Sequence, residues 1–525
     1  MRKTIALVFL ILFFISSCTN VNTALNGDQD AEGFGAADEL QKASGEITAA
    51  PTPEATYTPS PLPSPAPTPE PLPEKPKYIF LIIGDGMGYA HLLLGNVYEK
   101  ILHEDWGYEA LWDSFGQQHL IAAGQESSDG GTSLATGYNT KPGLIARTPD
   151  GGKLYTIMDR ANENGYATGV ITNAGLTDAT PATFASHAPG RYKYITVARN
   201  MAESNVDFLA GGGMRYILDE DSAKIWGRED FTGRRPEYLG SPDIIESFYA
   251  QGYTAFWGID GIAEYESTLD TFDVNHGDKI LAMFESSNML FQSSKYSKQS
   301  LETVADEPDL DEMTQSAIDF LSKDDDGFIL MIEEALIDKS SHNQDVATVA
   351  QEMHMMQKTL GVVFDFYSEH PDDTLIIFTA DHECGYYTYT QEGYAEMLAL
   401  PAIDWHTDSD SLYLMLADEC RTYVSESSLR KLMQAGDMDL WGDDDKDYGV
   451  VHGLIAETLC KRYGLYSRTG EHSGLPVPCY TQGLKSEVFA EVEHISEIPI
   501  LICDIMEWEA LPEIIDQDNS TRKND

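Results

Sequence analysis

The chain has 525 residues, of which 42% are hydrophobic, so it is long enough and apolar enough to bury a large core. Its 86 acidic residues far outnumber its 34 lysines and arginines, and the formal net charge is -52. Such a surface repels phosphates, which argues against binding of DNA or RNA through a basic face. A phosphate site in this chain would need local positive charge from metal ions or arginine. The length is compatible with two domains or with one large α/β domain.

The first 18 residues have the form of an export signal. Arg2 and Lys3 precede an apolar stretch that is short for a membrane span, and residues 15–17 (Ile-Ser-Ser) lead to Cys18. This ending resembles a bacterial lipobox, which predicts lipid modification of Cys18. The protein would then be exported and anchored to a bacterial membrane as a lipoprotein, at the cell surface or on the periplasmic side. The alternative is an ordinary signal peptide with an incidental cysteine.

A polar, proline-rich segment follows the signal. Residues 19–76 carry few apolar side chains, and residues 51–76 are dominated by proline, serine, threonine and glutamate. This composition predicts a disordered, extended stalk. The folded body is expected over residues 77–515, followed by a disordered tail at 516–525.

Cysteines are few in the folded body. Five follow Cys18 in the chain: Cys384, Cys420, Cys460, Cys479 and Cys503. Outside the cytoplasm they could form at most two disulfides, with one thiol left over. The sequence leaves their connectivity open.

The folded body alternates predicted strands with predicted helices. Continuous apolar runs predict buried parallel strands within 77–86, 167–173, 206–213, 327–338 and 373–382. Helical patterns occupy 309–323 and 346–370. This alternation predicts an α/β fold, a doubly wound, mostly parallel central sheet with helices on both faces, whose ligands bind beyond the carboxyl ends of the strands. Residues 386–465 are aromatic, acidic and helical in pattern, and we expect them to form a helical or irregular cap inserted over the site.

Acids and histidines gather where the predicted strands end. Taken singly, Asp85 is a turn-former about as often as a ligand, and a lone pair such as Asp338 and His342, four apart on one helix face, is more often structural than a zinc site. Their accumulation in one chain favours metal binding. The set comprises Asp85, Asp178, Thr180, Glu333, Asp338, His342, Asp381, His382 and His472. It mixes oxygen donors with imidazoles and contains no sulfur, which fits zinc beside a harder ion such as magnesium.

Seven stretches, in a fixed order, resemble the alkaline phosphatase family. They are "FLIIGDGMG", "SLATGYNTKPG", "GVITNAGLTDATPATFASH", "VDFLAGGGMR", "EMTQSAIDFLSKDDDGFILMIEEALIDKSSHNQD", "LIIFTADHE" and "EHSGLPVPCY". The resemblance covers nearly all of residues 77–510. It implies the alkaline-phosphatase-like α/β fold and hydrolysis of phosphate monoesters.

The resemblance also implies a role for each candidate residue. One Zn2+ would be held by Asp338, His342 and His472. A second Zn2+ would be held by Asp85, Asp381 and His382. One Mg2+ would be held by Asp178, Thr180 and Glu333, with Asp85 bridging. Arg191, in "HAPGR", matches the arginine that grips the substrate phosphate.

The run "GQESSDGGTSLATG" holds three serines, and the resemblance selects one. In the family the nucleophilic serine stands ten residues before the glycine of "ATG", which here is Gly137. Counting back identifies Ser127, rather than Ser128 or Ser133, as the predicted nucleophile. We expect Ser127 to head the following helix, where backbone N–H groups favour an alkoxide and a bound phosphate.

Two positions beside Ser127 depart from the family pattern. Glu126 stands where the family has an aspartate that orients the arginine, and Ser128-Asp129 replace residues that are usually alanine. The longer Glu126 would hold Arg191 differently, and Asp129 would add negative charge near the substrate, so we expect weaker phosphate binding or lower turnover. Lys339, directly after a predicted zinc ligand, is compatible with a monoesterase and lies within reach of phosphate through a water.

Three functions agree with these residues. The favoured one is hydrolysis of small phosphomonoesters through a phosphoserine intermediate, with no nucleic acid partner. The nearest alternative is a phosphodiesterase or sulfatase-like hydrolase of the same superfamily, which shares the two-zinc frame. The third is a non-catalytic surface lipoprotein that binds phosphate. The physiological substrate and the oligomeric state stay open, with a homodimer among the options.

Overall fold

The computed structural model describes residues 74–103, 107–219, 221, 240–258, 271–295, 307–390 and 464–516. The predicted export signal, nearly all of the stalk, most of the cap and the C-terminal tail beyond residue 516 lie outside these residues. Among the described helices, none has both the length and the apolar character needed to cross a membrane.

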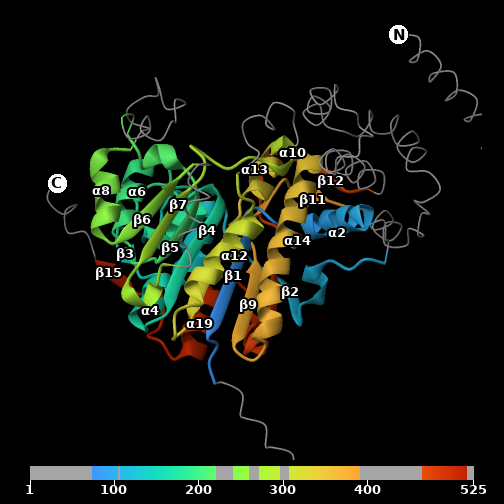
Figure 1. Cartoon of the computed structure of the whole chain (residues 1–525). Coiled ribbons are helices and arrows are strands. Elements are labelled where there is room, and N and C mark those ends of the chain that lie inside the picture. Colours follow the sequence, from blue (N-terminus) through green and yellow to red (C-terminus); the bar gives the residue numbers. More distant parts are fainter. Residues whose placement is uncertain are drawn as a thin grey trace, which may run out of the picture. The chain divides into compact units, whose positions relative to one another are not determined.

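A nine-stranded sheet forms the centre of the described chain (Figure 1). The strands, in spatial order, are β2 (Gln117–Ile121), β14 (Val477–Gly483), β9 (Thr374–Thr379), β1 (Tyr78–Gly84), β8 (Phe328–Glu334), β4 (Ala167–Gly175), β5 (Phe208–Gly212), β7 (Lys279–Met283) and β6 (Tyr253–Trp257). All pairings from β9 through β6 are parallel, and only β14 runs antiparallel to its neighbours β9 and β2. The predicted mostly parallel α/β sheet is therefore confirmed.

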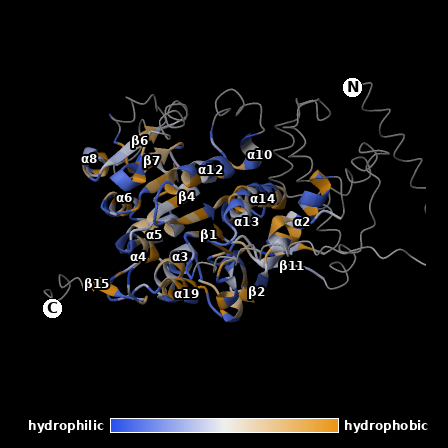
Figure 2. Ribbon diagram, turned by 60° about the horizontal axis from the view of Figure 1, so that its bottom comes forward, coloured by the Kyte–Doolittle hydropathy of each residue, from blue (hydrophilic) through white to orange (hydrophobic). Residues whose placement is uncertain are grey.

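Helices cover both faces of this sheet (Figure 2). One layer contains α2 (Tyr89–Leu102), α12 (Leu310–Leu321) and α14 (Val346–Glu369); the other contains α3 (Ser127–Thr136), α4 (Ile157–Glu163), α5 (Ala179–Ala185) and α19 (Glu497–Met506). The edge near β5 to β7 carries α6 (Tyr194–Ala202) and α8 (Pro242–Ala250). The short helical elements are α10 (Gln292–Lys295), α13 (Leu336–His342), η1 (Leu111–Ser114), η2 (Met214–Tyr216), η5 (Val274–His276) and η7 (Ser486–Glu491). The two predicted helices over 309–323 and 346–370 are confirmed as α12 and α14.

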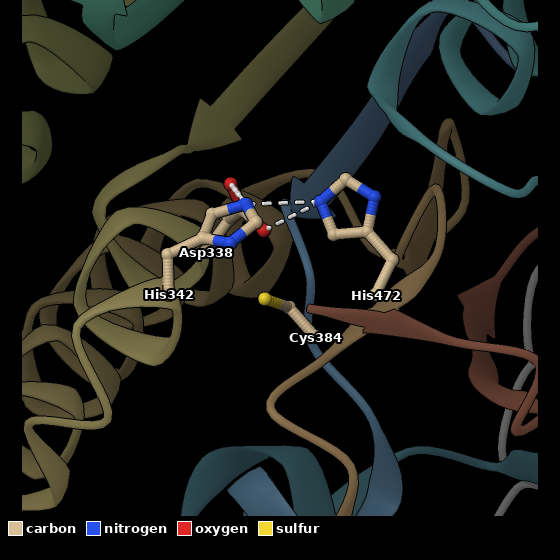
Figure 3. A group of neighbouring side chains, drawn as sticks. All are labelled: Asp338, His342, Cys384 and His472. Carbon is tan, nitrogen blue, oxygen red and sulfur yellow. Dashed lines mark hydrogen bonds and ion pairs between the residues drawn. The ribbon is translucent and has the colours of Figure 1, made fainter. Parts of the chain in front are cut away.

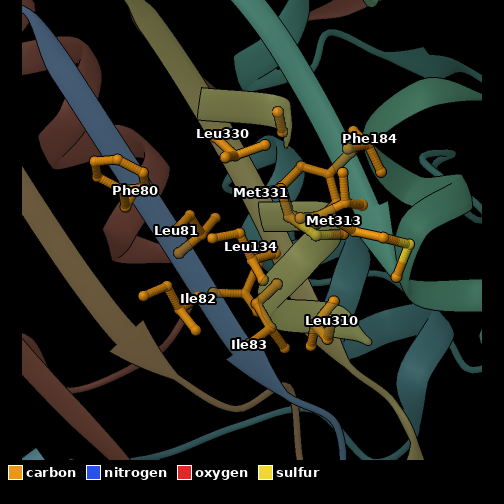
Figure 4. Close-up of a cluster of buried hydrophobic side chains, with 14 of the residues drawn as sticks. Phe80, Leu81, Ile82, Ile83, Leu134, Phe184, Leu310, Met313, Leu330 and Met331 are labelled. Atoms are coloured by element: carbon orange, nitrogen blue, oxygen red, sulfur yellow. The ribbon is translucent and has the colours of Figure 1, made fainter. Parts of the chain in front are cut away.

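The core explains why β1 reads as a continuous apolar run. All seven of its residues are buried, because helices lie on both sides of the strand. The ring of Phe80 packs against Phe366 of α14, with ring centroids 5.6 Å apart. Side chains of β1 and β8 also pack with Leu134 of α3, Phe184 of α5 and Leu310 of α12 (Figure 4).

The strand register sets the position of the polar groups. In β1, Ile83 lies opposite Glu333 of β8 on one side and Thr379 of β9 on the other. The segments that leave these strands therefore begin at the same edge of the sheet, and they carry Asp85 and Asp381. Parallel pairing alone brings these acids together, which is the arrangement expected for a ligand site in such sheets.

Two small ladders stand beyond this edge. β10 (Glu383–Cys384) pairs with β13 (His472–Ser473), and β11 (Tyr387–Thr388) pairs with β12 (Tyr466–Ser467). The chain therefore leaves and re-enters the described fold at one place, at the two ends of the segment predicted as a cap. A further ladder joins β3 (Lys153–Leu154) to β15 (Ile514–Asp516).

Three of the cysteines are described. Cys384, Cys479 and Cys503 are buried free thiols. Cys420 and Cys460 lie outside the described residues, so of the two disulfides that the sequence allows at most, one between this pair stays possible.

A half-buried carboxylate between β4 and β5, that of Asp207, predicts a pH-dependent stability. Both the amide and the hydroxyl of Thr168 donate to Asp207 Oδ2, at 2.9 and 3.1 Å, yet burial raises the pKa of Asp207 to about 6. Because the pKa is raised on folding, the folded protein holds this proton more tightly than the unfolded chain does. The free energy of unfolding therefore falls as the pH rises from about 4 to about 6. Asp207→Asn should therefore gain stability relative to the unmodified protein across this window, on the order of 1–3 kcal/mol.

Denaturant unfolding of both proteins at pH 4 and pH 8 measures this difference. Asp365→Asn, at an exposed position of α14, is the matched control and should show no such pH-dependent gain. A stability difference for Asp207→Asn that is the same at both pH values would contradict the assignment.

Candidate active site

The first candidate metal group lies where β1 and β9 end. Ligand atoms of Asp85, Asp381 and His382 lie within 4.8 Å of one another, and all three side chains are buried. His382 Nε2 is 3.2 Å from Asp85 Oδ1 and 3.5 Å from Asp381 Oδ2. Asp85 Oδ1 accepts no hydrogen bond although it is buried. Such an oxygen is costly unless a cation faces it, so the residues fit a divalent metal ion.

The second group contains Asp338, His342 and His472 (Figure 3). The short helix α13 places Asp338 and His342 four residues apart on one face, as predicted, with His342 Nε2 3.3 Å from Asp338 Oδ2. His472 Nε2 is 3.4 Å from Asp338 Oδ1, an oxygen that is buried and accepts no hydrogen bond. The three side chains come from α13 and from the β13 ladder, and they point toward a common centre.

The histidine tautomers favour a cation at that centre. His342 Nδ1 donates to the carbonyl of Gly470 at 2.6 Å, and His472 Nδ1 donates to the carbonyl of Gln125 at 3.2 Å, because a carbonyl can only accept. Their Nε2 atoms face each other at 3.0 Å. In neutral imidazoles both Nε2 atoms then carry lone pairs, which is how metal-binding histidines are usually oriented.

Cys384 also belongs to this group, although the predicted set of donors contained no sulfur. Its Sγ lies within the same 4.8 Å group as Asp338, His342 and His472. The cause is a long-range pairing, because the β10–β13 ladder places Cys384 opposite His472. Burial, followed by the charge of Asp338, raises the pKa of the Cys384 thiol above its usual value. The only signal in the sequence is its position two residues after His382.

The predicted magnesium ligands form a looser set. Thr180, in the first turn of α5, has its hydroxyl 3.4 Å from Asp85 Oδ2 and 3.2 Å from Asp381 Oδ2. Glu333 accepts a hydrogen bond from Thr172 Oγ1. Burial, then the charge of Asp85, raises the pKa of Glu333 well above its usual range. Thr180 and Glu333 therefore border the first metal group directly.

Asp178 joins this region to two cations. Its Oδ2 is 3.0 Å from Lys339 Nζ, and its Oδ1 is 3.3 Å from Arg191 Nη2. Burial alone would raise the pKa of Asp178, but Lys339 and then Arg191 lower it to about 2. Asp178 is thus ionised at neutral pH, and it fixes both cations at the wall of the cavity.

Ser127 lies between the two metal groups and this cation pair. It is the first residue of α3, so the predicted helix start is confirmed. Its Oγ is 3.2 Å from His382 Nε2. Ser127, Arg191, Lys339, His342 and His472 line one cavity of about 470 Å³. Ser127 is only 1% exposed, and it thus borders a space that cations and metal-binding side chains also line.

Glu126 pairs with Arg191 and does not point to solvent. Its Oε2 forms an ion pair with Arg191 Nη1, and its Oε1 accepts hydrogen bonds from Ser128 Oγ and, at 2.6 Å, from the Gly143 amide. Burial would raise the pKa of Glu126, but the charge of Arg191 and these donors lower it. The extra methylene therefore lets one carboxylate hold both Arg191 and the 143 loop.

Asp129 has a capping role that the sequence did not indicate. Its Oδ2 accepts from the Gln125 amide at 2.8 Å and its Oδ1 from the Glu126 amide at 3.0 Å. It thus caps the start of α3, and it is absent from the described residues that line the cavity. The carboxylate thus faces local backbone donors rather than the cavity, and its effect on phosphate binding stays a prediction.

Comparisons with known proteins agree on one family. The alkaline phosphatase family model matches residues 76–507. Alkaline phosphatase 3 of Bacillus subtilis is 25% identical over 437 residues, which cover 79% of this chain and 85% of that protein. Streptomycin-6-phosphate phosphatase of Streptomyces griseus is 26% identical over 333 residues, or 58% of this chain and 73% of that protein.

Solved structures show the same fold. Alkaline phosphatase from the Antarctic bacterium TAB5 superposes with a TM-score of 0.57 at 22% identity, covering 83% of this chain and 99% of that chain. Alkaline phosphatase from Thermus thermophilus has a TM-score of 0.59 at 17% identity, covering 85% of this chain and 94% of that chain.

Close packing at Gly86 predicts a selective loss of metal binding. Gly86 has a φ of +72°, and a Cβ there would lie 2.9 Å from Asp338 Cβ, Asp338 Oδ1 and Cys384 Cβ. Gly86→Ala should therefore displace Asp338 and lower the divalent metal retained after dialysis at least several-fold. Gly361→Ala, where the nearest atom is 3.9 Å away, is the control and should retain metal normally. Elemental analysis that finds equal metal in both variants would contradict this prediction.

Proposed function

Because the chain belongs to the alkaline phosphatase family and is thereby a phosphoric monoester hydrolase, we propose that it acts through a phosphoserine formed on Ser127. The observation that carries this proposal is the position of Ser127. Its hydroxyl begins α3, lies 3.2 Å from His382 Nε2 and lines the same cavity as Arg191. A nucleophile, a phosphate-binding cation and two metal-binding groups are thus within one site.

The proposed metals are two Zn2+ and one Mg2+. Asp85, Asp381 and His382 would hold one zinc ion, and Asp338, His342 and His472 the other. Asp178, Thr180 and Glu333 would hold magnesium, with Asp85 bridging. A variant of the TAB5 enzyme carries magnesium in the site called M3, which supports a magnesium site in this fold. When bound, such ions supply charge neutralisation for the attacking and leaving oxygens and lower the pKa of a serine hydroxyl.

The chain's own residues position the nucleophile and the phosphoryl group. Ser127 Oγ attacks phosphorus as the ester P–O bond breaks, and the alcohol leaves on the opposite side. The backbone amides at the start of α3 face the phosphoryl oxygens. Water then attacks the phosphoserine, releases inorganic phosphate and returns Ser127 to its hydroxyl form. The protonated Lys339, held by Asp178 at 3.0 Å, adds positive charge to the cavity wall.

Arg191 orients the phosphoryl group. Its guanidinium is held on two sides, by Glu126 through Nη1 and by Asp178 through Nη2. A planar fork fixed in this way can donate to two non-bridging oxygens at once. The carboxylates also partly neutralise it, so the grip on phosphate is weaker than that of an unpaired arginine.

Two other functions make different predictions in an assay with nitrophenyl substrates. A phosphodiesterase or sulfatase-like hydrolase would cleave a nitrophenyl diester or sulfate faster than the nitrophenyl monoester. A non-catalytic phosphate-binding lipoprotein would cleave none of them, with or without added zinc and magnesium. The Asp178–Lys339–Arg191 cluster favours the monoesterase, because a dianionic phosphoryl group needs more positive charge than a monoanionic diester.

Location is a separate proposal that rests on the sequence alone. The lipobox-like ending at Cys18 favours export and attachment to a bacterial membrane through a lipid anchor. Release of the Cys18→Ala protein from the membrane fraction would support it, whereas wild-type protein found wholly in the culture medium would contradict it.

Substitution of Ser127 tests the nucleophile. Ser127→Ala should abolish labelled phosphoenzyme and lower turnover by several orders of magnitude, while metal content stays unchanged because the serine is not part of either metal group. Ser133→Ala is the matched control, since Ser133 is buried in the same helix and bonds to Asp129 O and Asn139. Label trapped on Ser128 or Ser133 in the unmodified enzyme would refute the assignment.

Substitution of Glu126 tests the weakened phosphate grip. Glu126→Gln keeps the acceptor for Gly143 but removes a negative charge, and Asp178 still holds Arg191. Phosphate should then inhibit about threefold to tenfold more strongly, since a nearby like charge costs an anion on the order of 1 kcal/mol. Glu471→Gln removes an exposed charge from the same cavity and should change inhibition much less. Equal or weaker inhibition in Glu126→Gln would show that this carboxylate mainly positions Arg191.

A further inference from the structure

A row of tyrosines and arginines forms one wall of the active-site cavity. Tyr192, Tyr194, Arg215 and Tyr216 all line it together with Arg191. Tyr192 lies two residues before α6, and Tyr194 begins that helix. Arg215 and Tyr216 belong to η2, which contacts α6. Neither the metal groups nor Ser127 use these side chains.

The wall is continuous with the phosphate-binding arginine. Arg191 Cζ lies 5.5 Å from the ring centre of Tyr192. The Tyr192 and Tyr194 rings meet edge-on at 6.3 Å, and the Tyr194 and Tyr216 rings stack at 4.2 Å with an angle of 18°. Aromatic faces thus begin directly beside the group that would hold the phosphoryl oxygens.

The far end of the wall is fixed in place. Arg215 Nη2 donates to the Tyr216 hydroxyl at 2.7 Å, and Arg215 Cζ lies 4.7 Å from the Tyr216 ring centre. Tyr216 is only 7% exposed, so it serves as a base on which Tyr194 stacks. Tyr192, by contrast, is 73% exposed. A solvent-facing aromatic ring beside a rigid stack offers a ready surface for another planar ring.

The cavity has space and polar groups beyond those that phosphate needs. Its volume of about 470 Å³ falls in the range of pockets that hold whole organic ligands. Thr177 and Arg215 line it beside the tyrosines, so a hydroxyl-bearing residue and a second guanidinium belong to this wall.

We propose that this wall is a leaving-group subsite that selects phosphate monoesters of alcohols that carry a planar aromatic or heteroaromatic ring, such as nucleosides, over monoesters of alcohols without a ring. The ring would stack on Tyr194 with the Tyr192 ring at its edge, while Arg191 holds the phosphoryl group. The inference rests on the proposed phosphomonoesterase function and adds the class of substrate.

Two substrates with similar leaving groups test the subsite. Adenosine 5′-phosphate and glycerol 3-phosphate both release a primary alcohol, so they differ mainly in the ring. In the metal-loaded enzyme kcat/KM should favour the nucleotide about threefold to tenfold, the range that one aromatic contact contributes. Tyr194→Leu should reduce this ratio to near one, because kcat/KM for the nucleotide should fall much more than that for glycerol 3-phosphate. Tyr194→Phe keeps the ring and should keep the preference.

Controls separate this inference from the function on which it rests. Tyr249→Leu, at an exposed tyrosine of α8 outside the cavity lining, should leave the ratio unchanged. Adenosine alone should inhibit the unmodified enzyme competitively, and Tyr194→Leu should weaken this inhibition. No preference in the unmodified enzyme, or the same preference in Tyr194→Leu, would overturn the subsite. Failure to hydrolyse either substrate would instead refute the proposed function.

Discussion

The structure depends on one electrostatic constraint, the burial of many carboxylates at one edge of a parallel sheet. Asp85, Glu333, Glu334, Asp338 and Asp381 are each at most 2% exposed, and strand register brings several of them together. Burial, then the charge of Asp85, raises the pKa of Asp381 to about 7. Burial would lower the pKa of His382, but Asp381 and Asp85 raise it to about 10. Both shifts mean that this edge needs positive charge. Lys339 and Arg191 supply part of it, and divalent ions at the two candidate metal groups would supply the rest.

The glycine-rich run around Ser127 packs closely against the segment that carries one of these buried carboxylates, Asp381. A Cβ on Gly130 would lie 2.4 Å from the Asp381 carbonyl oxygen, and one on Gly124 would lie 2.4 Å from Gly130 Cα. Only glycine lets α3 approach the segment that carries Asp381 and His382 so closely. The run is therefore an ordered helix start packed on a metal group, and its small residues place the Ser127 hydroxyl beside His382. In a chain whose net charge is -52, this local arrangement of cations decides whether phosphate can bind.

The parts predictable from the sequence are those that local pattern or a family motif determines. β1, β8 and β9 appear as apolar runs because they are buried on both faces, and Asp338 and His342 follow helical spacing. Cys384, the Asp129 cap and the wall at Tyr194 and Tyr216 depend on contacts between distant segments or on competition for backbone donors. The linear sequence contains little information about such contacts. It also does not distinguish a Glu126 that pairs with Arg191 from one that points to solvent, and the structure shows the pairing.

The most direct test of this account is an anomalous-scattering map of crystals grown with zinc, magnesium and vanadate. The account predicts two zinc peaks, one among Asp85, Asp381 and His382 and one among Asp338, His342 and His472. Vanadate should be bonded to Ser127 Oγ and should contact Arg191. Zinc at only one group, zinc coordinated by other residues, or vanadate bound away from Ser127 would contradict it.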